Sequence, residues 1–188
     1  MSALMSRAAS LMEEAEQLRE HAAYLEDLSD RDSVLPVLNR RALVRELAHV
    51  LKQASQTETT SSFLYLNVMN AEETKRHMGH AAAEALLIHA ASVAAGALRT
   101  TDVIGSLGGY DPGVLIALAK GNAAADEAGE LVSILEATPL RWRERIVAVK
   151  IAWELHELKP SESVDDVLTA AERARRAVAD VRGGEPDQ

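Results

Sequence analysis

Two apolar runs on either side of a short glycine-rich turn constrain the fold of this chain more than any other feature. They occur in SLGGYDPGVLIAL, residues 106–118. Glycine between β-forming residues is typical of the tight connection between two antiparallel strands. We therefore predict a β-hairpin with strands over 103–107 and 114–118. The turn consists of five residues that are candidates for a functional site: Gly108, Gly109, Tyr110, Asp111 and Pro112.

Strand-like and helix-like segments alternate along the rest of the chain. Residues 63–69 are rich in β-forming side chains, and the segment after Asn39, a good N-cap, has apolar residues at helical spacing. A hairpin embedded among such segments predicts an α/β (α+β) protein with a mixed β-sheet and flanking helices, of the ferredoxin-like or palm type. The remaining predicted elements are helices over 70–79, 81–99, 122–137 and 161–181 and a strand over 145–155.

Residues 1–30 have the pattern of a coiled-coil helix. Apolar side chains recur at alternating steps of four and three, and glutamates occupy positions between them. This spacing is a heptad seam. It favours a parallel homodimer through this helix, and a single amphipathic helix lying on its own domain is the alternative. The predicted seam consists of Leu4, Ala8, Leu11, Ala15, Leu18, Ala22 and Leu25.

Composition and charge exclude several classes of function. The chain has 188 residues, of which 47% are hydrophobic, enough for one domain of ordinary size and an extra element. It contains no cysteine, so disulfides and thiol chemistry are excluded. The net charge of −9 argues against nucleic-acid partners, and no apolar run is long enough for membrane insertion. We expect a cytoplasmic protein with a helix over 1–30, one domain over 31–182 and a disordered tail over 183–188.

Four motifs spread over most of the chain resemble those of the GGDEF domain, the fold of diguanylate cyclases. DSVLPVLNRR (32–41) is similar to the motif that opens such domains, and GHAAAEALL (79–87) is close to their GHxxGDxLL motif. RTTDVIGSLGG (99–109) matches their RxxD segment and glycine pair, and VLTAAERARRAVADV (167–181) has the outline of their last helix. The resemblance implies a palm-type GGDEF fold and a role in bacterial signalling by cyclic di-GMP.

The resemblance also implies where a cyclase would hold metal, and this chain departs from the family there. Diguanylate cyclases join two GTP molecules by attack of a 3′-hydroxyl on an α-phosphate, and carboxylates hold the divalent metal that neutralises the phosphate charge. The family's metal aspartate at the end of the first strand aligns with Asn67, a weaker ligand for Mg²⁺. The turn sequence GGDEF or GGEEF is replaced by GGYDP, which retains one metal carboxylate, Asp111.

Positions that resemble the family's GTP contacts are altered as well. The family's phosphate-binding Phe-Lys pair aligns with Ala71 and Glu72. An anionic side chain, Glu72, therefore stands where the resemblance implies a lysine. Lys75 aligns with the asparagine that contacts guanine, and Glu84 retains the acidic partner of that asparagine. Ala179 replaces a phosphate-contacting lysine. These losses predict that the chain is not an enzyme, with no catalytic residue, metal or cofactor, and that the hairpin is the remnant of an active site.

One functional motif of the family is intact, the RxxD sequence from Arg99 to Asp102. In GGDEF proteins this motif is the inhibitory site that binds cyclic di-GMP, so the resemblance implies ligand binding by these two residues. A guanidinium can hold guanine or phosphate, and a carboxylate can accept hydrogen bonds from guanine. The alternative is structural, since arginine suits a helix end and aspartate a turn. The family's second inhibitory arginine aligns roughly with Glu130.

Three further groups of side chains are weaker candidates. His77 and His80 have a spacing seen in metal sites, but the sequence shows no further ligands for zinc. Arginines recur in RWRER (141–145), which is either a basic edge for a partner or the solvated start of a strand. The arginines of 173–176 have the pattern of a solvated helix face.

The sequence therefore predicts a catalytically inactive GGDEF-like regulatory domain that acts through protein–protein interaction. Cyclic di-GMP is a candidate ligand at Arg99 and Asp102, and residues 110–112 would form an exposed surface for the partner. Two alternatives belong to other classes of function. One is a ligand-independent dimeric scaffold or adaptor. The other is a GTP-binding domain or weakly active cyclase, which Glu84 and Asp111 support.

Overall fold

The computed structural model describes residues 30–57, 60–108, 112–116 and 119–183 and, in the N-terminal segment, residues 7, 12–15 and 17. The chain divides into two units, Met1–Arg31 and Asp32–Gln188. Residues 7, 12–15 and 17 of the first unit are helical, and Ala15 of the predicted seam is among them. The other seam residues lie outside the described residues: Leu4, Ala8, Leu11, Leu18, Ala22 and Leu25.

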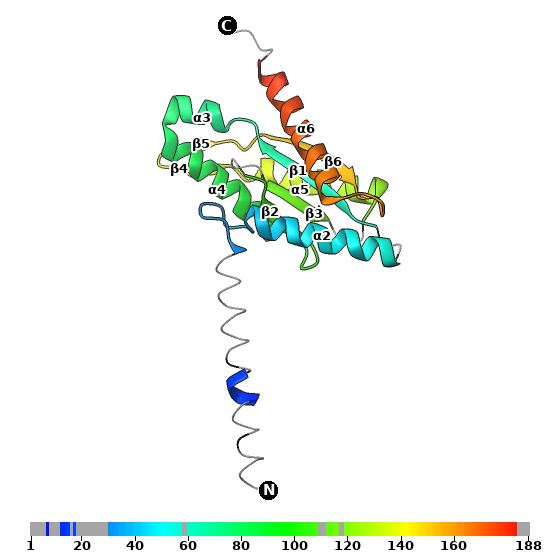
Figure 1. The fold of residues 1–188 in the computed structure, drawn as a ribbon. Coiled ribbons are helices and arrows are strands. Elements are labelled where there is room, and N and C mark those ends of the chain that lie inside the picture. Colours follow the sequence, from blue (N-terminus) through cyan, green and yellow to red (C-terminus); the bar gives the residue numbers. More distant parts are fainter. Residues whose placement is uncertain are drawn as a thin grey trace. The chain divides into compact units, whose positions relative to one another are not determined.

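A four-stranded sheet in the order β2-β3-β1-β6 forms the centre of the second unit (Figure 1). Neighbouring strands run antiparallel, and a parallel bridge joins Leu38 to Gly105 of the edge strand β2. The predicted hairpin is confirmed, because β2 pairs with β3 and the chain reverses between Ser106 and Pro112. The strands are β1 (Ser62–Val68), β2 (Val103–Ser106), β3 (Pro112–Ile116) and β6 (Ile151–Glu157).

The predicted helices of the second unit are confirmed to within a few residues. Asn39 caps the first of them, since the Ala42 N–H donates to Asn39 Oδ1 at 2.9 Å. Gly79 separates the second from the third, and its φ of +90° is a conformation that glycine adopts without steric cost. The helices are α2 (Arg40–Thr57), α3 (Ala71–Met78), α4 (His80–Ala97), α5 (Gly121–Ala137) and α6 (Val164–Gly183).

Side chains of β1 alternate between two layers of core, and this alternation places helices on both faces of the sheet. Leu64, Leu66 and Val68 pack into a core with residues of α4 and α5. Phe63 and Tyr65 pack into a second core with residues of α2 and α6. In Figure 1, α2 in cyan and α6 in orange and red lie across one face of the sheet. The predicted arrangement of a sheet with flanking helices is therefore confirmed.

Asp32 shapes the loop that leads into α2. Its Oδ1 accepts hydrogen bonds from the N–H groups of Val34 and Leu35, both at 3.0 Å, and its own N–H donates to the Val37 carbonyl at 2.9 Å. Burial raises the pKa of Asp32, but the hydrogen bonds from Leu35, Val34 and Ser106 together outweigh it. The pKa of Asp32 is therefore lower than usual.

Replacing Asp32 by alanine is expected to lower the free energy of unfolding by about 1 kcal/mol, the usual net contribution of a hydrogen-bonding side chain. Because the folded pKa is lowered, the carboxylate contributes fully above its unfolded pKa, and this contribution is lost as the pH falls through the folded pKa. Urea unfolding of the two proteins at neutral pH and at a pH below the folded pKa checks this. An equal loss at both pH values would contradict the role of the charged carboxylate.

The prediction of a single strand over 145–155 is wrong. Asn70 explains the interruption, because its amide donates to the Ala148 carbonyl at 2.7 Å and accepts from the Lys150 N–H at 3.2 Å. The Asn70 side chain therefore takes up backbone groups of residues 148 and 150, and the strand is interrupted there. Trp153 is 40% exposed on the edge strand β6. The first part of the segment is β5 (Arg145–Val147), which pairs with β4 (Leu140–Trp142) in a separate two-stranded ribbon, and β4 was not predicted.

Candidate functional site

The hairpin turn begins at Gly108, and part of it is described. Gly108 has a φ of +99°, which favours glycine, and its N–H donates to Ser106 Oγ at 3.2 Å. Pro112 begins β3. Gly109, Tyr110 and Asp111 lie outside the described residues. The partner surface expected at 110–112 therefore stays a prediction.

Asn67 lies near the end of β1, at the same end of the sheet as the hairpin turn. The pairing of β1 with β3 extends to Tyr65 and Gly113, and Asn67 follows further along β1. On the other side of β1, Asn67 pairs with Ala152 of β6. Its side chain is half-buried and, by the alternation of the strand, lies on the same face as Tyr65. A neutral amide thus occupies the strand end nearest to the turn.

The other positions of the predicted remnant lie on α3 and α4. Glu72 and Glu73 are in the first turn of α3 and Lys75 is in its last turn, and all three are exposed. Carboxylates at a helix N-terminus meet its partial positive charge, so this helix end is less able to bind phosphate. Glu84 is half-buried on α4. Within the described part of the chain, no group of three or more histidine or acidic side chains is arranged to hold a metal ion.

Arg99 and Asp102 come together in the turn between α4 and β2. The Arg99 N–H donates to Asp102 Oδ2 at 3.2 Å, and the Asp102 N–H donates to the Arg99 carbonyl at 3.1 Å. The Arg99 guanidinium makes an ion pair with Glu127 of α5, with Nη1 and Oε1 2.7 Å apart, and 63% of the Arg99 side chain is exposed. Arg99 and Asp102 line a cleft of about 230 Å³ together with residues of α5.

Carboxylates outnumber cations in this cleft. Glu127 and Glu130 line it besides Asp102, so the Arg99 guanidinium shares the cleft with three acidic side chains. Cyclic di-GMP carries two phosphate charges, and it would have to replace Glu127 as the partner of Arg99 while approaching the other two acids. The predicted pair is present, but α5 supplies a carboxylate that competes with an anionic ligand.

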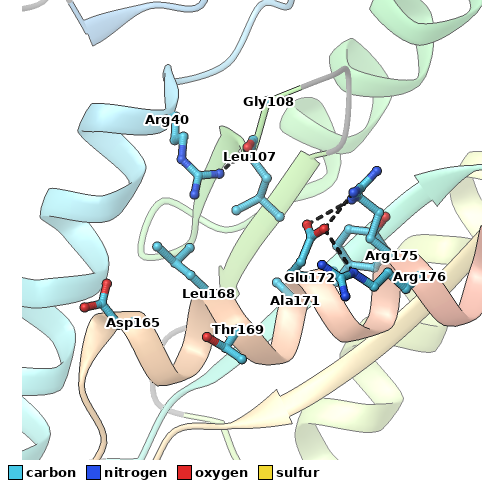
Figure 2. A pocket seen from close by; sticks show the side chains of 11 residues that line it. Arg40, Leu107, Gly108, Asp165, Leu168, Thr169, Ala171, Glu172, Arg175 and Arg176 are labelled. Carbon is cyan, nitrogen blue, oxygen red and sulfur yellow. Dashed lines mark hydrogen bonds and ion pairs between the residues drawn. The ribbon is translucent and has the colours of Figure 1, made fainter.

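A larger cleft beside the hairpin was not predicted from the sequence (Figure 2). It measures about 780 Å³ and lies between Arg40 of α2, the start of the turn at Leu107 and Gly108, and one side of α6. Arg40 donates a hydrogen bond to the Leu107 carbonyl, which holds its guanidinium beside the turn. Tyr65 of β1 also lines the cleft. The hairpin turn therefore has a cavity next to it.

Glu172 organises the α6 side of this larger cleft. It accepts hydrogen bonds of 2.6 and 2.9 Å from Arg175, and its Oε1 is 3.5 Å from Arg176 Nε. The hydrogen bond from Arg175 lowers the pKa of Glu172 to about 2. The arginines of 173–176 are exposed, as the solvated face predicts, and Arg175 and Arg176 also line the cleft. Their spacing from Glu172, three and four residues along a helix, was the available signal.

The other two groups of weaker candidates, His77 with His80 and residues 141–145, lie on α3, α4 and the two-stranded ribbon. His77 is exposed near the end of α3, and His80 begins α4. Residues 141–145 include the last two residues of β4, the turn of the two-stranded ribbon and the first residue of β5.

Of the helices that the structure describes, none is long and apolar enough to cross a membrane.

Comparison with known proteins agrees with the resemblance seen in the motifs. The family model described as diguanylate cyclase, GGDEF domain, matches residues 29–181. The diguanylate cyclase TpbB of Pseudomonas aeruginosa (strain UCBPP-PA14) is 29% identical over 126 residues, which is 66% of this chain and 29% of that protein. This chain therefore spans less than a third of the length of that relative.

Solved structures share the fold. The coiled coil and GGDEF domain of DgcB from Caulobacter crescentus, in complex with c-di-GMP, has a TM-score of 0.76 at 24% identity, and the match covers 97% of this chain and 96% of that one. The diguanylate cyclase SiaD from Pseudomonas aeruginosa, in complex with its activator SiaC, has a TM-score of 0.82 at 19% identity, covering 96% and 69%. The predicted fold is therefore confirmed. Because the family model matches most of the length of this chain, the chain belongs to the GGDEF domain family.

Proposed function

We propose that this chain is a catalytically inactive GGDEF domain that regulates cyclic di-GMP signalling through contact with another protein. The observation that carries the proposal is the amide of Asn67 near the end of β1, where the family resemblance requires a metal-binding carboxylate. An amide is neutral, and hard cations such as Mg²⁺ are held in proteins chiefly by carboxylates and phosphates. A GTP-bound metal would therefore be held weakly.

Glu72 supports the same conclusion from the phosphate side. It lies in the first turn of α3, where the resemblance requires a cation for the phosphates of GTP. Losing one electrostatic contact of this kind typically lowers turnover by about 10²–10³-fold. Two such changes at one site leave little rate enhancement, and a role that needs no turnover fits the chain better.

A regulatory role through protein contact has support among the structural relatives. SiaD is found in complex with its activator SiaC, and the DgcB structure combines a coiled coil with the GGDEF domain. This chain carries a heptad seam over 1–30, for which we propose a homodimer. Two-fold pairing of the helices would present two copies of the domain to a partner.

A cyclase assay tests the proposal. The full chain is incubated with GTP and either Mg²⁺ or Mn²⁺ at high protein concentration, and the nucleotides are separated by chromatography. The expected result is no cyclic di-GMP and no linear dinucleotide above a protein-free blank. The variant Asn67→Asp is expected to stay inactive as well, because Glu72 still repels the phosphates.

Controls make the result of the assay decisive. An active diguanylate cyclase under the same conditions must form product, and a thermal melt must show that the chain is folded. Product formed by the wild-type chain and lost on Asp111→Asn would overturn the proposal and favour a weakly active cyclase.

A second candidate function is cyclic di-GMP binding at Arg99 and Asp102. Both residues line one cleft, and more than half of the Arg99 side chain is exposed. The Arg99 side of its ion pair with Glu127 is largely exposed to solvent, and exposed ion pairs contribute little to stability. A ligand can therefore displace Glu127 from Arg99. We expect the wild-type chain to bind cyclic di-GMP weakly. Calorimetric titration separates this effector role from a ligand-independent scaffold, which would release no heat of binding.

A further inference from the structure

The two edges of the central sheet differ in how much of their backbone is paired. Strand β2 forms one edge and β6 the other (Figure 1). Beside β2, the Leu38 N–H donates to the Ile104 carbonyl at 3.2 Å, and the Ser106 N–H donates to the Leu38 carbonyl at 2.7 Å. Among the residues that the structure describes, no strand pairs with the outer side of β6. The backbone groups of such an open edge can bind a further strand.

Backbone hydrogen bonds at the two ends of β6 show which residues are directed toward β1. The Lys150 carbonyl, just before the strand, accepts a hydrogen bond from the Met69 N–H on the β1 side at 2.8 Å. The Leu158 N–H, just after the strand, donates to the Ser61 carbonyl on the same side at 3.0 Å. The even-numbered residues that flank β6 therefore direct these backbone groups toward β1.

Alternation along the strand then directs the odd-numbered residues of β6 outward. The pairing with β1 is continuous from Ile151 to Glu157, so no bulge shifts the alternation. Ile151 agrees with this, because its N–H donates to Glu136 Oε1 of α5 at 3.2 Å and not to β1. The backbone N–H and carbonyl groups of Trp153, Leu155 and Glu157 are therefore directed to the open edge.

Trp153 offers an apolar contact along the same edge. Its side chain is 40% exposed, although its partner in β1, Leu66, is buried. Its neighbours on the same face of the sheet, Ile151 and Leu155, are half-buried and pack against the core. A strand added to this edge would place one side chain directly opposite Trp153, in contact with the indole ring. Tryptophan is among the residues that contribute most to binding in protein interfaces.

The charges along β6 favour a basic partner. Glu154 and Glu157 are exposed, and β6 contains no lysine or arginine, since Lys150 and Lys159 lie beyond its two ends. His156 is already hydrogen-bonded to a glutamate that follows the strand, at 3.1 Å. A second copy of β6 would bring the same glutamates to the edge, and like charges on paired strands are destabilising. A basic segment is instead attracted, both by these glutamates and by the net charge of −9.

We propose that the open edge of β6 binds a basic, extended segment of another protein by strand addition. The backbone groups of residues 153, 155 and 157 pair with the segment, and these bonds supply affinity. Specificity comes from an apolar side chain opposite Trp153 and, next to it in the segment, a lysine or arginine opposite Glu154. This inference names a surface and a partner class for the protein contact in the proposed function, and in that respect it rests on the proposed function.

Peptide selection on the full chain tests this inference. A random peptide library displayed on phage is selected on the wild-type chain and counter-selected on the double variant Trp153→Thr/Glu154→Lys. The expected peptides carry lysine or arginine next to an aliphatic or aromatic residue. Their affinity, measured by fluorescence anisotropy, should fall at least about tenfold in Trp153→Thr and about threefold or more in Glu154→Lys. Both positions are exposed, and a thermal melt checks that each variant is folded.

Backbone methylation of a selected peptide separates strand addition from other modes of binding. In an added strand, alternate N–H groups point at β6 and the others point at solvent. Methylating the nitrogens of the first set should weaken binding at least about tenfold, because several hydrogen bonds are lost together. Methylating the second set should leave the affinity nearly unchanged. Equal effects of the two sets would overturn the inference.

The matched control is Glu144→Lys, which makes the same charge change in the turn of the β4–β5 ribbon, outside the central sheet. It should leave peptide affinity unchanged. The inference is also overturned if no basic peptide is selected, if the β6 variants bind as tightly as this control, or if Trp153→Thr instead lowers the oligomeric state in sedimentation velocity, which would make a second copy the occupant. A chain that makes cyclic di-GMP and still binds these peptides would refute the proposed function alone, whereas an inactive chain that binds none refutes this inference alone.

Discussion

Replacing Phe63 by alanine is expected to lower the free energy of unfolding by about 3–5 kcal/mol. Phe63 is 1% exposed, lies in the core between the sheet, α2 and α6, and is the single phenylalanine of the chain. Few other aromatic side chains are available to fill the space that its ring would leave. Urea unfolding followed by circular dichroism measures the loss, and a change below about 1 kcal/mol would contradict the described packing.

Gly113 provides a matched test of the same contact. A Cβ atom at position 113 would lie 2.5 Å from Phe63 Cζ, closer than any real contact of this kind. Gly113→Ala should therefore destabilise the wild-type chain by about 1–3 kcal/mol. In a Phe63→Leu background the added methyl group should cost much less, because the ring atom it meets is absent. Simple additivity of the two losses would show that the contact is not formed.

Replacing Glu127 by glutamine is expected to tighten cyclic di-GMP binding about tenfold, because it removes a charge that pairs with Arg99 and repels phosphate. Replacing Arg99 by alanine is expected to weaken binding by about tenfold to a hundredfold, the cost of losing a charged hydrogen-bonding group. Isothermal titration calorimetry on the wild-type chain and the two variants measures both effects.

The control for this titration is Asp126→Asn. Asp126 is next to Glu127 on α5 but does not line the Arg99 cleft, so the same loss of charge should leave binding nearly unchanged. If Arg99→Ala binds cyclic di-GMP as tightly as the wild-type chain, the ligand does not use this site. If neither the wild-type chain nor Glu127→Gln binds, the intact RxxD sequence has only its structural role in the turn.

Most helices and strands were predictable because their signals are local. Asn39 precedes an apolar helical pattern and caps it, and the run of β-forming residues over 63–68 is that of a strand between two layers of core. The hairpin was predictable because its glycines mark the reversal between β2 and β3. The break before β6 was not predictable from local signals, because it depends on hydrogen bonds from Asn70 to Ala148 and Lys150, which are 78 and 80 residues further along the chain.

The candidate site divides in the same way. Arg99 and Asp102 are three residues apart, so their hydrogen-bonded turn could be expected from the motif. Glu127 reaches Arg99 only because α5 packs beside α4. Arg40 reaches the hairpin across 67 residues of sequence, so the larger cleft had no local signal apart from the spacing of Glu172, Arg175 and Arg176.

The sequence by itself determined the order of most elements and the family motifs, because these depend on residue identity and short-range spacing. The tertiary structure decided which charges share a space. It paired Glu127 with Arg99, the arginine expected to bind ligand, and it placed the Arg40 guanidinium beside the hairpin turn. The physical reason is that ion pairs and grooves form between residues distant in the chain, and packing sets those distances.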